Sequence, residues 1–319
     1  DSGCIRRCSC RGAKLFVGGA KSGFCFSAVS WESWQGFSRP LHLGRDVLGE
    51  LLDGGQSFRW NQVDGECAVW QGVFGMNLVQ VRLGGDDIAE FRLASGCGSA
   101  SEVEVYFGQD RDWKKLFDAL PWRSDLHLKE CMERFPGLRI LRQPFGETLF
   151  SFLCSSAKQI VQIKQCCLEV AREFGEDLGN GSHAWPGWSV LADVGEAALR
   201  ECKLGYRARY VSGVARILSA DPDFETRVLE LPFKEARNLP MELPGVGAKV
   251  ADCVLLFGAG KLEAFPVDTW VTKVMSRVYG LAGWDATKVT LFGSAHFGSA
   301  AGLAQQFLFA GERRLSEKG

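Results

Sequence analysis

The sequence predicts an α+β protein, in which an N-terminal antiparallel β-sheet domain is followed by a helical domain. From about residue 55 to residue 107, apolar and polar residues alternate with period two between glycine-rich turns. After Asp110 the apolar residues recur at helical spacing, and Pro-Gly pairs separate the segments. We therefore expect an N-terminal extension at 1–35, the sheet domain at 36–122 and the helical domain at 123–319.

The alternation predicts an antiparallel meander of about five strands, at 57–61, 68–74, 77–83, 88–93 and 103–107. The helical spacing predicts helices at about 110–119, 125–135, 146–155, 158–174, 206–219, 233–240, 248–259, 268–280 and 299–315. Asp268 and Asp285 stand at N-cap positions, where a side chain accepts bonds from the first backbone N–H groups of a helix.

The composition is that of an ordinary folded protein, with 46% of the 319 residues hydrophobic and 24% charged. It excludes a disordered chain, and no apolar run approaches the roughly 20 residues of a membrane-spanning helix. The 37 basic and 38 acidic residues give a net charge of -1, which argues against a protein that coats nucleic acid as a polycation. Basic residues still gather at 200–216, either as a nucleic-acid contact or as a solvated helix face.

The twelve cysteines follow no regular spacing, so we expect free thiols in a reducing compartment. Cys4, Cys8 and Cys10 cluster, but no Cys or His follows them at zinc-finger spacing, and we predict no metal site. Residues 1–30 are rich in Gly, Ser and Cys without a clear period, which predicts a poorly ordered segment.

The most informative segment is Leu-Pro-Gly-Val-Gly-Ala-Lys at 243–249, which lies between two predicted helices. Gly245 and Gly247 flank Val246 and allow the backbone to turn tightly and to approach a partner closely. Backbone N–H groups at the start of the second helix favour an anion, such as a DNA phosphate. The alternative is a helical hairpin that binds nothing.

Lys249 begins a helix whose inner face is apolar, and an amine shielded from water loses its proton more readily. A neutral amine is a nucleophile and can form a Schiff base at C1′ of a sugar. Asp268 ends the sequence Pro-Val-Asp at 266–268. It either only caps a helix, or also faces Lys249 and stabilises positive charge on the sugar.

Several motifs together resemble the eukaryotic-type 8-oxoguanine DNA glycosylase/lyase, a family of the helix-hairpin-helix glycosylase superfamily. They are the hairpin motif, Gly-Gln-Ser-Phe-Arg-Trp at 55–60, Ser-Phe-Leu-Cys-Ser-Ser at 151–156, Leu-Gly-Tyr-Arg-Ala-Arg-Tyr at 204–210, Val-Ala-Asp-Cys at 250–253, Pro-Val-Asp at 266–268 and Gln305 to Phe309. The resemblance runs from about residue 41 to residue 315 and implies a helix-hairpin-helix at about 233–259.

The resemblance implies a bifunctional enzyme of base excision repair. Lys249 would attack C1′ and expel the base, and Asp268 would support the positive charge on the sugar. The resulting imine would permit strand cleavage by β-elimination. The target base must be flipped out of the duplex, because C1′ is otherwise out of reach.

The resemblance also implies how the oxidised guanine is read. The carbonyl of Gly55 would accept the N7 hydrogen that only the oxidised base carries, a bond that discriminates strongly when buried. Cys253 and Phe309 would sandwich the base, and Gln305 would bond its Watson–Crick edge. Without the family, these positions are a turn glycine, two core residues and a helix-surface glutamine.

The remaining implied roles concern DNA contacts. Tyr206 would fill the gap left by the flipped base, and Arg207 would hold the partner base. The hairpin backbone at Gly245, Val246 and Gly247 would bind a phosphate.

The chain departs from the family in two segments. Ala157, Lys158, Gln159 and Gln162 replace an Asn-rich triplet and an Arg that read the opposing cytosine. We therefore expect a weaker preference for cytosine, with Lys158 and Gln159 as DNA contacts. Trp270 replaces a phosphate-binding His, and its indole N–H donates a bond but carries no charge.

Two other functions stay open. One is a helix-hairpin-helix glycosylase for another damaged purine, but the alkyl-purine enzymes usually lack the lysine. The other is a non-catalytic DNA-binding hairpin protein, which has no use for Lys249 and Asp268 together. No cysteine follows Cys253, which excludes the iron–sulfur branch, and we expect no cofactor. The expected partner is double-stranded DNA containing oxidised guanine, bound by a monomer inside the cell, in the nucleus or nucleoid and without a membrane.

Overall fold

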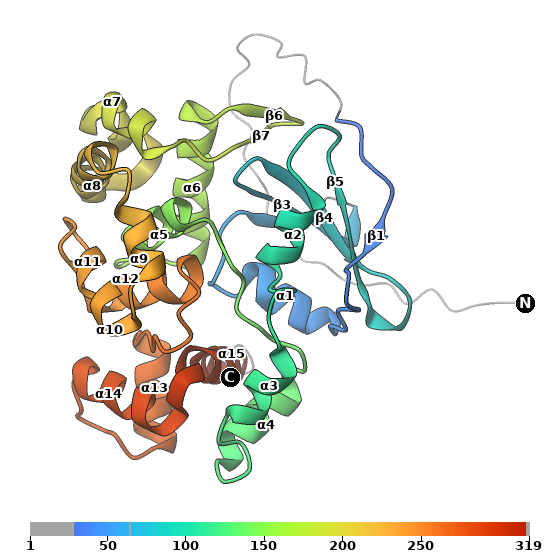
Figure 1. Cartoon of the computed structure of the whole chain (residues 1–319), viewed down its shortest axis with the longest axis vertical. Helices are drawn as coiled ribbons and strands as arrows, with labels where there is room; N and C mark the ends of the chain where they lie inside the picture. The colour runs from blue at the N-terminus through green and yellow to red at the C-terminus, as the bar shows by residue number, and fades with distance from the viewer. Residues whose placement is uncertain (1–28, 64, 317–319) are drawn as a thin grey trace, which may run out of the picture.

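The structure is a computed structural model that describes residues 29–63 and 65–316, and it has a sheet beside a larger group of helices (Figure 1). A five-stranded antiparallel sheet comes first in the chain and helices dominate the rest, so the predicted α+β class is confirmed. The expectations for residues 1–28, including Cys4, Cys8 and Cys10, lie outside the described residues. The boundaries at 35 and 122 stay predictions.

The sheet has the strand order β1-β5-β4-β3-β2, and all neighbours are antiparallel. Its strands are β1 (Gln35–Gly36), β2 (Trp60–Val63), β3 (Glu66–Phe74), β4 (Asn77–Leu83) and β5 (Ala89–Leu93). The strands expected at 68–74, 77–83 and 88–93 are confirmed. The strand expected at 57–61 begins only at Trp60, because the preceding residues form the turn that leads to the site described below.

The predicted strand at 103–107 is wrong, because helix α2 (Ala100–Tyr106) occupies it. The side chain of Ser99 caps this helix by accepting a bond from the Glu102 backbone N–H at 3.4 Å. Val103 and Tyr106 then share one buried face at a spacing of three residues. A short run with Val at every second position fits a strand and a helix equally well, and the capping pattern Ser-x-x-Glu decides for the helix.

The other helices include every one that the sequence predicts, with shifted ends. They are α1 (Arg45–Asp53), α3 (Trp113–Ala119), α4 (Leu126–Arg134), α5 (Phe145–Cys154), α6 (Ile160–Phe174), α7 (Trp188–Leu199), α8 (Ala208–Ala220), α9 (Phe224–Glu230), α10 (Phe233–Ala236), α11 (Asn238–Met241), α12 (Ala248–Cys253), α13 (Thr269–Val278), α14 (Ala286–Phe297) and α15 (Ala301–Ser316). The helix expected at 233–240 is divided into α10 and α11, and α12 continues as a π-helical turn over Val254–Gly258.

Besides α2, the sequence does not predict α1, α7, α9 and α14. Helix α7 contains Gly195 at φ +79°, which interrupts its periodicity. In α14 the buried positions are Val289, Gly293 and Phe297, while Leu291 is exposed, so the apolar pattern is diluted. Both predicted N-caps are confirmed, because Asp268 accepts a bond from the Val271 N–H and Asp285 accepts one from the Lys288 N–H.

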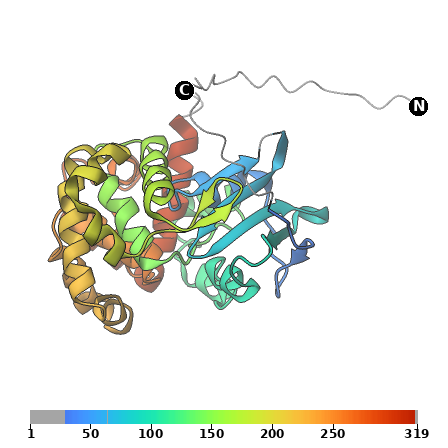
Figure 2. The ribbon, with the colours of Figure 1, turned by 90° about the horizontal axis from the view of Figure 1, so that it is seen from above.

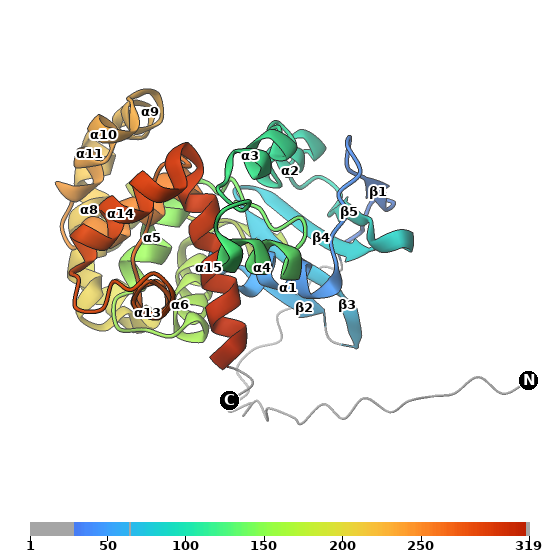
Figure 3. The same ribbon diagram turned by 90° about the horizontal axis from the view of Figure 1, so that it is seen from below.

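A short hairpin, β6 (Asp177–Gly179) and β7 (Ser182–His183), reaches from the helical part to the sheet (Figure 2). Leu178 and Ala184 pack against Val73, Leu78 and Ala94 of the sheet region. Helix α15 lies between α13 and α4 when the molecule is seen from below (Figure 3). Helix α15 is thereby brought beside residues from the first half of the chain.

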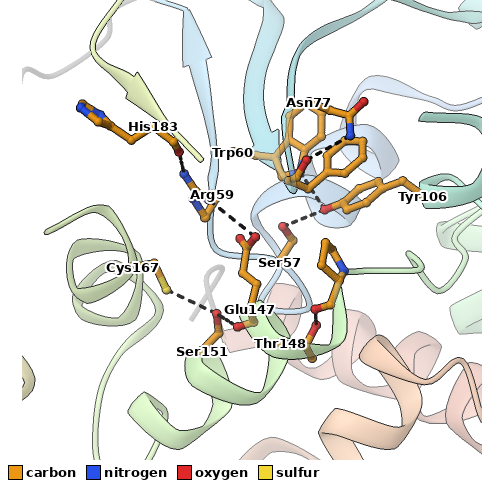
Figure 4. Close-up of polar contacts among 12 residues, drawn as sticks. Ser57, Arg59, Trp60, Asn77, Tyr106, Glu147, Thr148, Ser151, Cys167 and His183 are labelled. Carbon is orange, nitrogen blue, oxygen red and sulfur yellow. Dashed lines mark hydrogen bonds and ion pairs between the residues drawn. The ribbon is translucent and has the colours of Figure 1, made fainter. Parts of the chain in front are cut away.

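A buried polar junction joins β2 to α5 and to the β6–β7 hairpin (Figure 4). Arg59 lies between the carboxylate of Glu147, with Nη1 and Oε2 3.6 Å apart, and the backbone carbonyl of His183, to which Nη2 donates. Tyr106 accepts a bond from the indole of Trp60 at 2.9 Å on the sheet side of this junction. The junction fixes the segment that begins at Gly55.

No helix within residues 29–63 and 65–316 combines the length and the apolar character needed to cross a membrane.

Candidate active site

A cavity of about 1060 Å³ opens between the Gly55 turn, the α5–α6 loop, α12, the start of α13 and α15. These segments are far apart in the sequence and meet because α15 packs beside α13. The cavity brings together all the residues predicted for catalysis and base binding, namely Lys249, Asp268, Gly55, Cys253, Gln305 and Phe309. Three of the predicted DNA contacts, Lys158, Gln159 and Trp270, line it as well.

Lys249 is the second residue of α12, two positions after Gly247, which is the N-cap in an extended conformation. Its side chain is half-buried, and Nζ donates a hydrogen bond of 2.8 Å to the hydroxyl of Ser155. The same nitrogen lies 5.5 Å from the centre of the Phe152 ring. The amine is therefore held at the cavity wall by the α5–α6 junction.

Asp268 is the N-cap of α13, and one carboxylate oxygen accepts a bond of 2.8 Å from the Val271 N–H. Burial raises the pKa of this carboxyl, against the opposing effects of the Val271 N–H and the charge of Lys249. The carboxyl thus both caps the helix and interacts electrostatically with Lys249. An acceptor of this kind is better suited to take up a proton than an exposed aspartate.

The residues predicted to hold the base surround one end of the cavity. Gly55 has φ +105°, and a Cβ placed on it would lie 3.1 Å from Cδ1 of Ile160 and 3.7 Å from Cζ of Phe309. No donor among the described residues bonds the Gly55 carbonyl. Burial raises the pKa of Cys253 to about 12, so its thiol is neutral at physiological pH. The cavity wall here is therefore uncharged and suits a flat, neutral ring.

Gln305 is 4% exposed, so it is a buried cavity residue and not a helix-surface glutamine. Its side-chain oxygen accepts a bond of 3.1 Å from Nε2 of Gln306. The amide nitrogen of Gln305 has no partner among the described residues and stays available for a ligand. A glutamine in this setting can bond a base edge.

Gln56 anchors the turn that carries Gly55, a role that the sequence did not reveal. Its side chain donates to the Arg139 carbonyl at 3.2 Å and accepts from the Leu141 N–H at 2.9 Å. Gln143 donates to the Gln56 carbonyl. These bonds satisfy both ends of a buried amide, which is 1% exposed, and hold the turn rigidly against the helical part.

The hairpin residues lie beside the cavity and do not line it. Gly245 has φ +80°, and a Cβ there would approach the Tyr210 ring to 2.6 Å, so glycine is required for both conformation and space. Val246 is buried, whereas Gly247 is exposed at the start of α12. The binding of a phosphate by this exposed backbone stays a prediction.

Tyr206 and Arg207 also lie outside the cavity lining. Tyr206 is 49% exposed, which fits a side chain that inserts into a partner. Arg207 is buried, with its guanidinium over the Tyr206 ring at 4.4 Å, and it donates to the Ser156 carbonyl. In this structure Arg207 therefore fixes the α5–α6 loop and supports Tyr206.

The α5–α6 loop is held by bonds within the protein. Lys158 donates to the Lys203 carbonyl at 3.1 Å, and the Gln162 side chain accepts from the Gln159 N–H at 3.0 Å as part of a capping box. Ala157 has φ +52°. Asparagine tolerates this left-handed conformation better than alanine does, so the departure from an Asn-rich triplet leaves strain in the backbone.

Replacing Ala157 with glycine is expected to raise the free energy of unfolding by roughly 1 kcal/mol, because glycine adopts positive φ without a Cβ clash. Urea denaturation measures the change. Ala197→Gly, at an exposed position inside α7, is the matched control and should lower the free energy of unfolding by about 1 kcal/mol. A loss of stability in Ala157→Gly equal to that of the control would contradict the strain.

Trp270 lines the cavity, and the ammonium of Lys273, one turn later on α13, lies 4.3 Å from the centre of its ring. Within residues 29–63 and 65–316, no group of three or more His, Cys, Asp or Glu side chains has the arrangement to hold a metal ion. The cysteines whose side chains are described there are free thiols, namely Cys97, Cys131, Cys154, Cys166, Cys167, Cys202 and Cys253.

Ser155 is the most direct partner of Lys249, and it was not predicted as a site residue. It lies in the Ser-Phe-Leu-Cys-Ser-Ser motif, which marked the segment without giving this side chain a role. Gln56 likewise lies inside a motif, Gly-Gln-Ser-Phe-Arg-Trp, in which only Gly55 is predicted as a site residue. In both cases the signal in the sequence is a polar residue that lies within a family motif but has no predicted chemical role.

Comparison with known proteins agrees with this arrangement. The family 8-oxoguanine DNA glycosylase, N-terminal domain, matches residues 45–149, and the HhH-GPD superfamily of base excision DNA repair proteins matches residues 150–293. The chain is 31% identical to a probable N-glycosylase/DNA lyase of Methanothermobacter thermautotrophicus, over 67% of this chain and 74% of that protein. It is 32% identical to an N-glycosylase/DNA lyase of Saccharomyces cerevisiae, over 74% and 69%.

Solved structures show the same relationship. The 8-oxoguanine glycosylase/lyase of Clostridium acetobutylicum, in complex with double-stranded DNA containing cytosine opposite 8-oxoguanine, superimposes with a TM-score of 0.77 at 28% identity. The match covers 91% of this chain and 99% of that one. The family predicted from the motifs is thereby confirmed: this chain belongs to the N-glycosylase/DNA lyase family of the HhH-GPD base excision DNA repair proteins.

Proposed function

We propose that the protein excises 8-oxoguanine from double-stranded DNA and then cleaves the damaged strand by β-elimination. The observation that supports this most directly is that one cavity contains Lys249, Asp268 and the predicted base-binding residues. A helix-hairpin-helix backbone for DNA lies beside it, in a chain of the glycosylase/lyase family. A protein that only holds DNA needs neither a cavity of this size nor an amine and a carboxyl within it.

Excision begins with Lys249 as a neutral amine. Its lone pair forms the Nζ–C1′ bond while the C1′–N9 bond breaks, and the base leaves with the electron pair of that bond and then gains a proton. The aminal opens to an imine. Removal of a C2′ proton then expels the 3′ phosphate and cleaves the strand.

Asp268 stabilises the positive charge that develops on the sugar and can take up a proton from Lys249. Its raised pKa makes it a better base than an exposed aspartate, and its cap on α13 fixes its position. The base is held between the neutral Cys253 thiol and Phe309, and Gln305 bonds its edge. The carbonyl of Gly55 accepts the N7 hydrogen that identifies the oxidised base.

We expect this protein to discriminate the opposing base less strongly than a protein that has an Asn-rich triplet and an arginine in this loop. The side-chain oxygen of Gln162 caps α6 and Lys158 bonds the Lys203 carbonyl, so both side chains already have partners within the protein. We therefore expect excision rates opposite C, A, G and T to lie within about tenfold of one another. Single-turnover assays on the four duplexes measure this, and a drop of a hundredfold or more opposite A, G and T would contradict it.

Borohydride trapping tests the chemistry. On a duplex with one 8-oxoguanine, the full chain should become covalently linked to DNA, and peptide mapping should place the link at Lys249. Lys249→Gln should give no trapped complex, and a duplex with undamaged guanine should give none with either protein. Trapping through another lysine, or unchanged trapping by Lys249→Gln, would overturn the mechanism.

The protein is proposed to act as a monomer on DNA inside the cell, without a membrane and without a cofactor. One flipped base occupies one cavity, and the imine nitrogen that comes from the lysine serves as the electron sink for elimination. Trapping in the presence of EDTA should therefore proceed at the rate seen without it. A metal requirement would show as a loss of trapping that added divalent cation restores.

A further inference from the structure

We infer that Ser155 is a positioning residue that directs the amine of Lys249 into the cavity. The inference rests on the proposed role of Lys249 as the nucleophile. It gives a role to a side chain that lines the cavity without contacting any other predicted site residue.

The contacts of Ser155 fix the direction of its hydrogen bonds. Ser155 follows the last residue of α5, and its hydroxyl donates a bond of 2.7 Å to the Phe152 carbonyl. Because a hydroxyl has one proton, only the acceptor lone pairs of Ser155 remain for Lys249, whose Nζ lies 2.8 Å away. Lys249 is therefore the donor in this pair, whether it is charged or neutral.

This direction orients the reactive lone pair. A neutral amine has two N–H bonds and one lone pair in a tetrahedral arrangement. With one N–H bound to Ser155, the lone pair must point away from Ser155. Since both residues line the cavity wall, the open directions around Nζ face the space where a sugar would lie.

The support behind Ser155 is rigid. The carbonyl of Phe152 accepts the hydrogen bond from Ser155. The Phe152 ring is stacked on Phe257 with ring centres 5.4 Å apart and contacts Phe58 edge-on at 5.5 Å. Phe152 is 4% exposed within the core of α5. A displacement of Ser155 would therefore require movement of a packed helix, so the amine is held with little freedom.

Removal of the Ser155 hydroxyl therefore leaves the amine of Lys249 without the partner that fixes its position, and a threonine at this place would supply a hydroxyl again.

Ser155→Ala tests the inference in single-turnover borohydride trapping on the 8-oxoguanine duplex. We expect trapping about tenfold slower at pH 7.5, with DNA affinity within twofold of the original. Ser155→Thr, which keeps the hydroxyl, should restore the trapping rate.

Ser124→Ala is the matched control. Ser124 also donates from its hydroxyl to the carbonyl three residues earlier, that of Pro121 at 3.1 Å, but it is exposed and remote from the cavity. Its trapping rate should be unchanged. Thermal unfolding of both alanine variants and of Ser155→Thr shows whether each is folded.

Two results would overturn the inference. One is a Ser155→Ala protein that traps at the original rate. The other is slow trapping by Ser155→Ala that Ser155→Thr does not restore, which indicates only a helix-end role. Lys249→Gln distinguishes these results from a failure of the proposed function. If Lys249→Gln still traps DNA, Lys249 is not the nucleophile. If Lys249→Gln does not trap while Ser155→Ala traps normally, only the role of Ser155 is refuted.

Discussion

Replacing Asp268 with asparagine is expected to lower the excision rate by about 10³-fold while raising the melting temperature. Asparagine caps a helix as well as aspartate does, so α13 should keep its start and the cavity its shape. The variant loses the negative charge beside the sugar and the proton acceptor for Lys249, which accounts for the lost rate. Single-turnover excision and thermal unfolding measure the two effects on one preparation.

The stability gain follows from the raised pKa of Asp268, for which burial is the largest cause. A carboxyl whose pKa is higher in the folded than in the unfolded state favours folding when protonated, and this contribution is lost as pH rises through the folded-state value. Asp268→Asn should therefore be more stable than the original protein at pH 7 and equally stable at pH 4. An active site that lowers stability in this way shows a trade-off between stability and activity.

Asp285→Asn is the matched control for this variant. Asp285 is also an N-cap, on α14, but it is exposed, and the Lys288 backbone N–H lowers its pKa. Its substitution should leave the excision rate unchanged and lower the melting temperature slightly at pH 7. Equal stability changes in the two variants, or full activity in Asp268→Asn, would show that Asp268 serves only as a cap.

The parts of the site that the sequence predicted are those with a local signature. Lys249 and Asp268 stand at helix starts, where the chemistry of an apolar face or an N-cap is visible within a few residues. Gly245 has a positive φ and lies against Tyr210, and a glycine in a turn motif indicates such a conformation. Gln305 has no local signature, and only the family resemblance predicted its place in the cavity.

The parts that could not be predicted depend on contacts between distant segments. The bond between Lys249 and Ser155 joins α12 to the end of α5, and no pattern within either segment specifies it. The contacts of Arg207 with the Ser156 carbonyl and the Tyr206 ring likewise join separate segments, while its predicted contact with a base stays a prediction. The strand expected at 103–107 failed for a local reason, because the cap at Ser99 outweighs an alternation of only a few residues.

Replacing Arg59 with methionine is expected to lower the free energy of unfolding by about 3–5 kcal/mol at pH 8. Arg59 and Glu147 are 7% and 10% exposed, so the substitution leaves a buried carboxyl without its cation. It also removes the donor to the His183 carbonyl, which ties the β6–β7 hairpin to the sheet (Figure 4). Arg82→Met, at a more exposed ion pair with Glu90, is the control and should lower it by less than about 1 kcal/mol.

The loss in Arg59→Met should depend on pH, with a sign set by Glu147. Burial raises the pKa of this carboxyl, and Arg59 opposes the increase, so the variant raises it further. A folded-state value above the unfolded one favours folding at low pH and is lost as pH rises. The deficit relative to the original protein should thus be smaller at pH 5 than at pH 8. Urea denaturation at both values measures the difference.

The double variant Arg59→Met/Glu147→Leu separates the buried charge from the lost packing. An apolar pair at this junction removes the uncompensated carboxyl, so most of the lost stability should return and its pH dependence should disappear. The bond to His183 stays absent in both variants, and a residual deficit of about 1 kcal/mol is expected from it. If the double variant is as unstable as Arg59→Met at pH 8, the loss comes from the broken hairpin contact and not from the unpaired carboxyl.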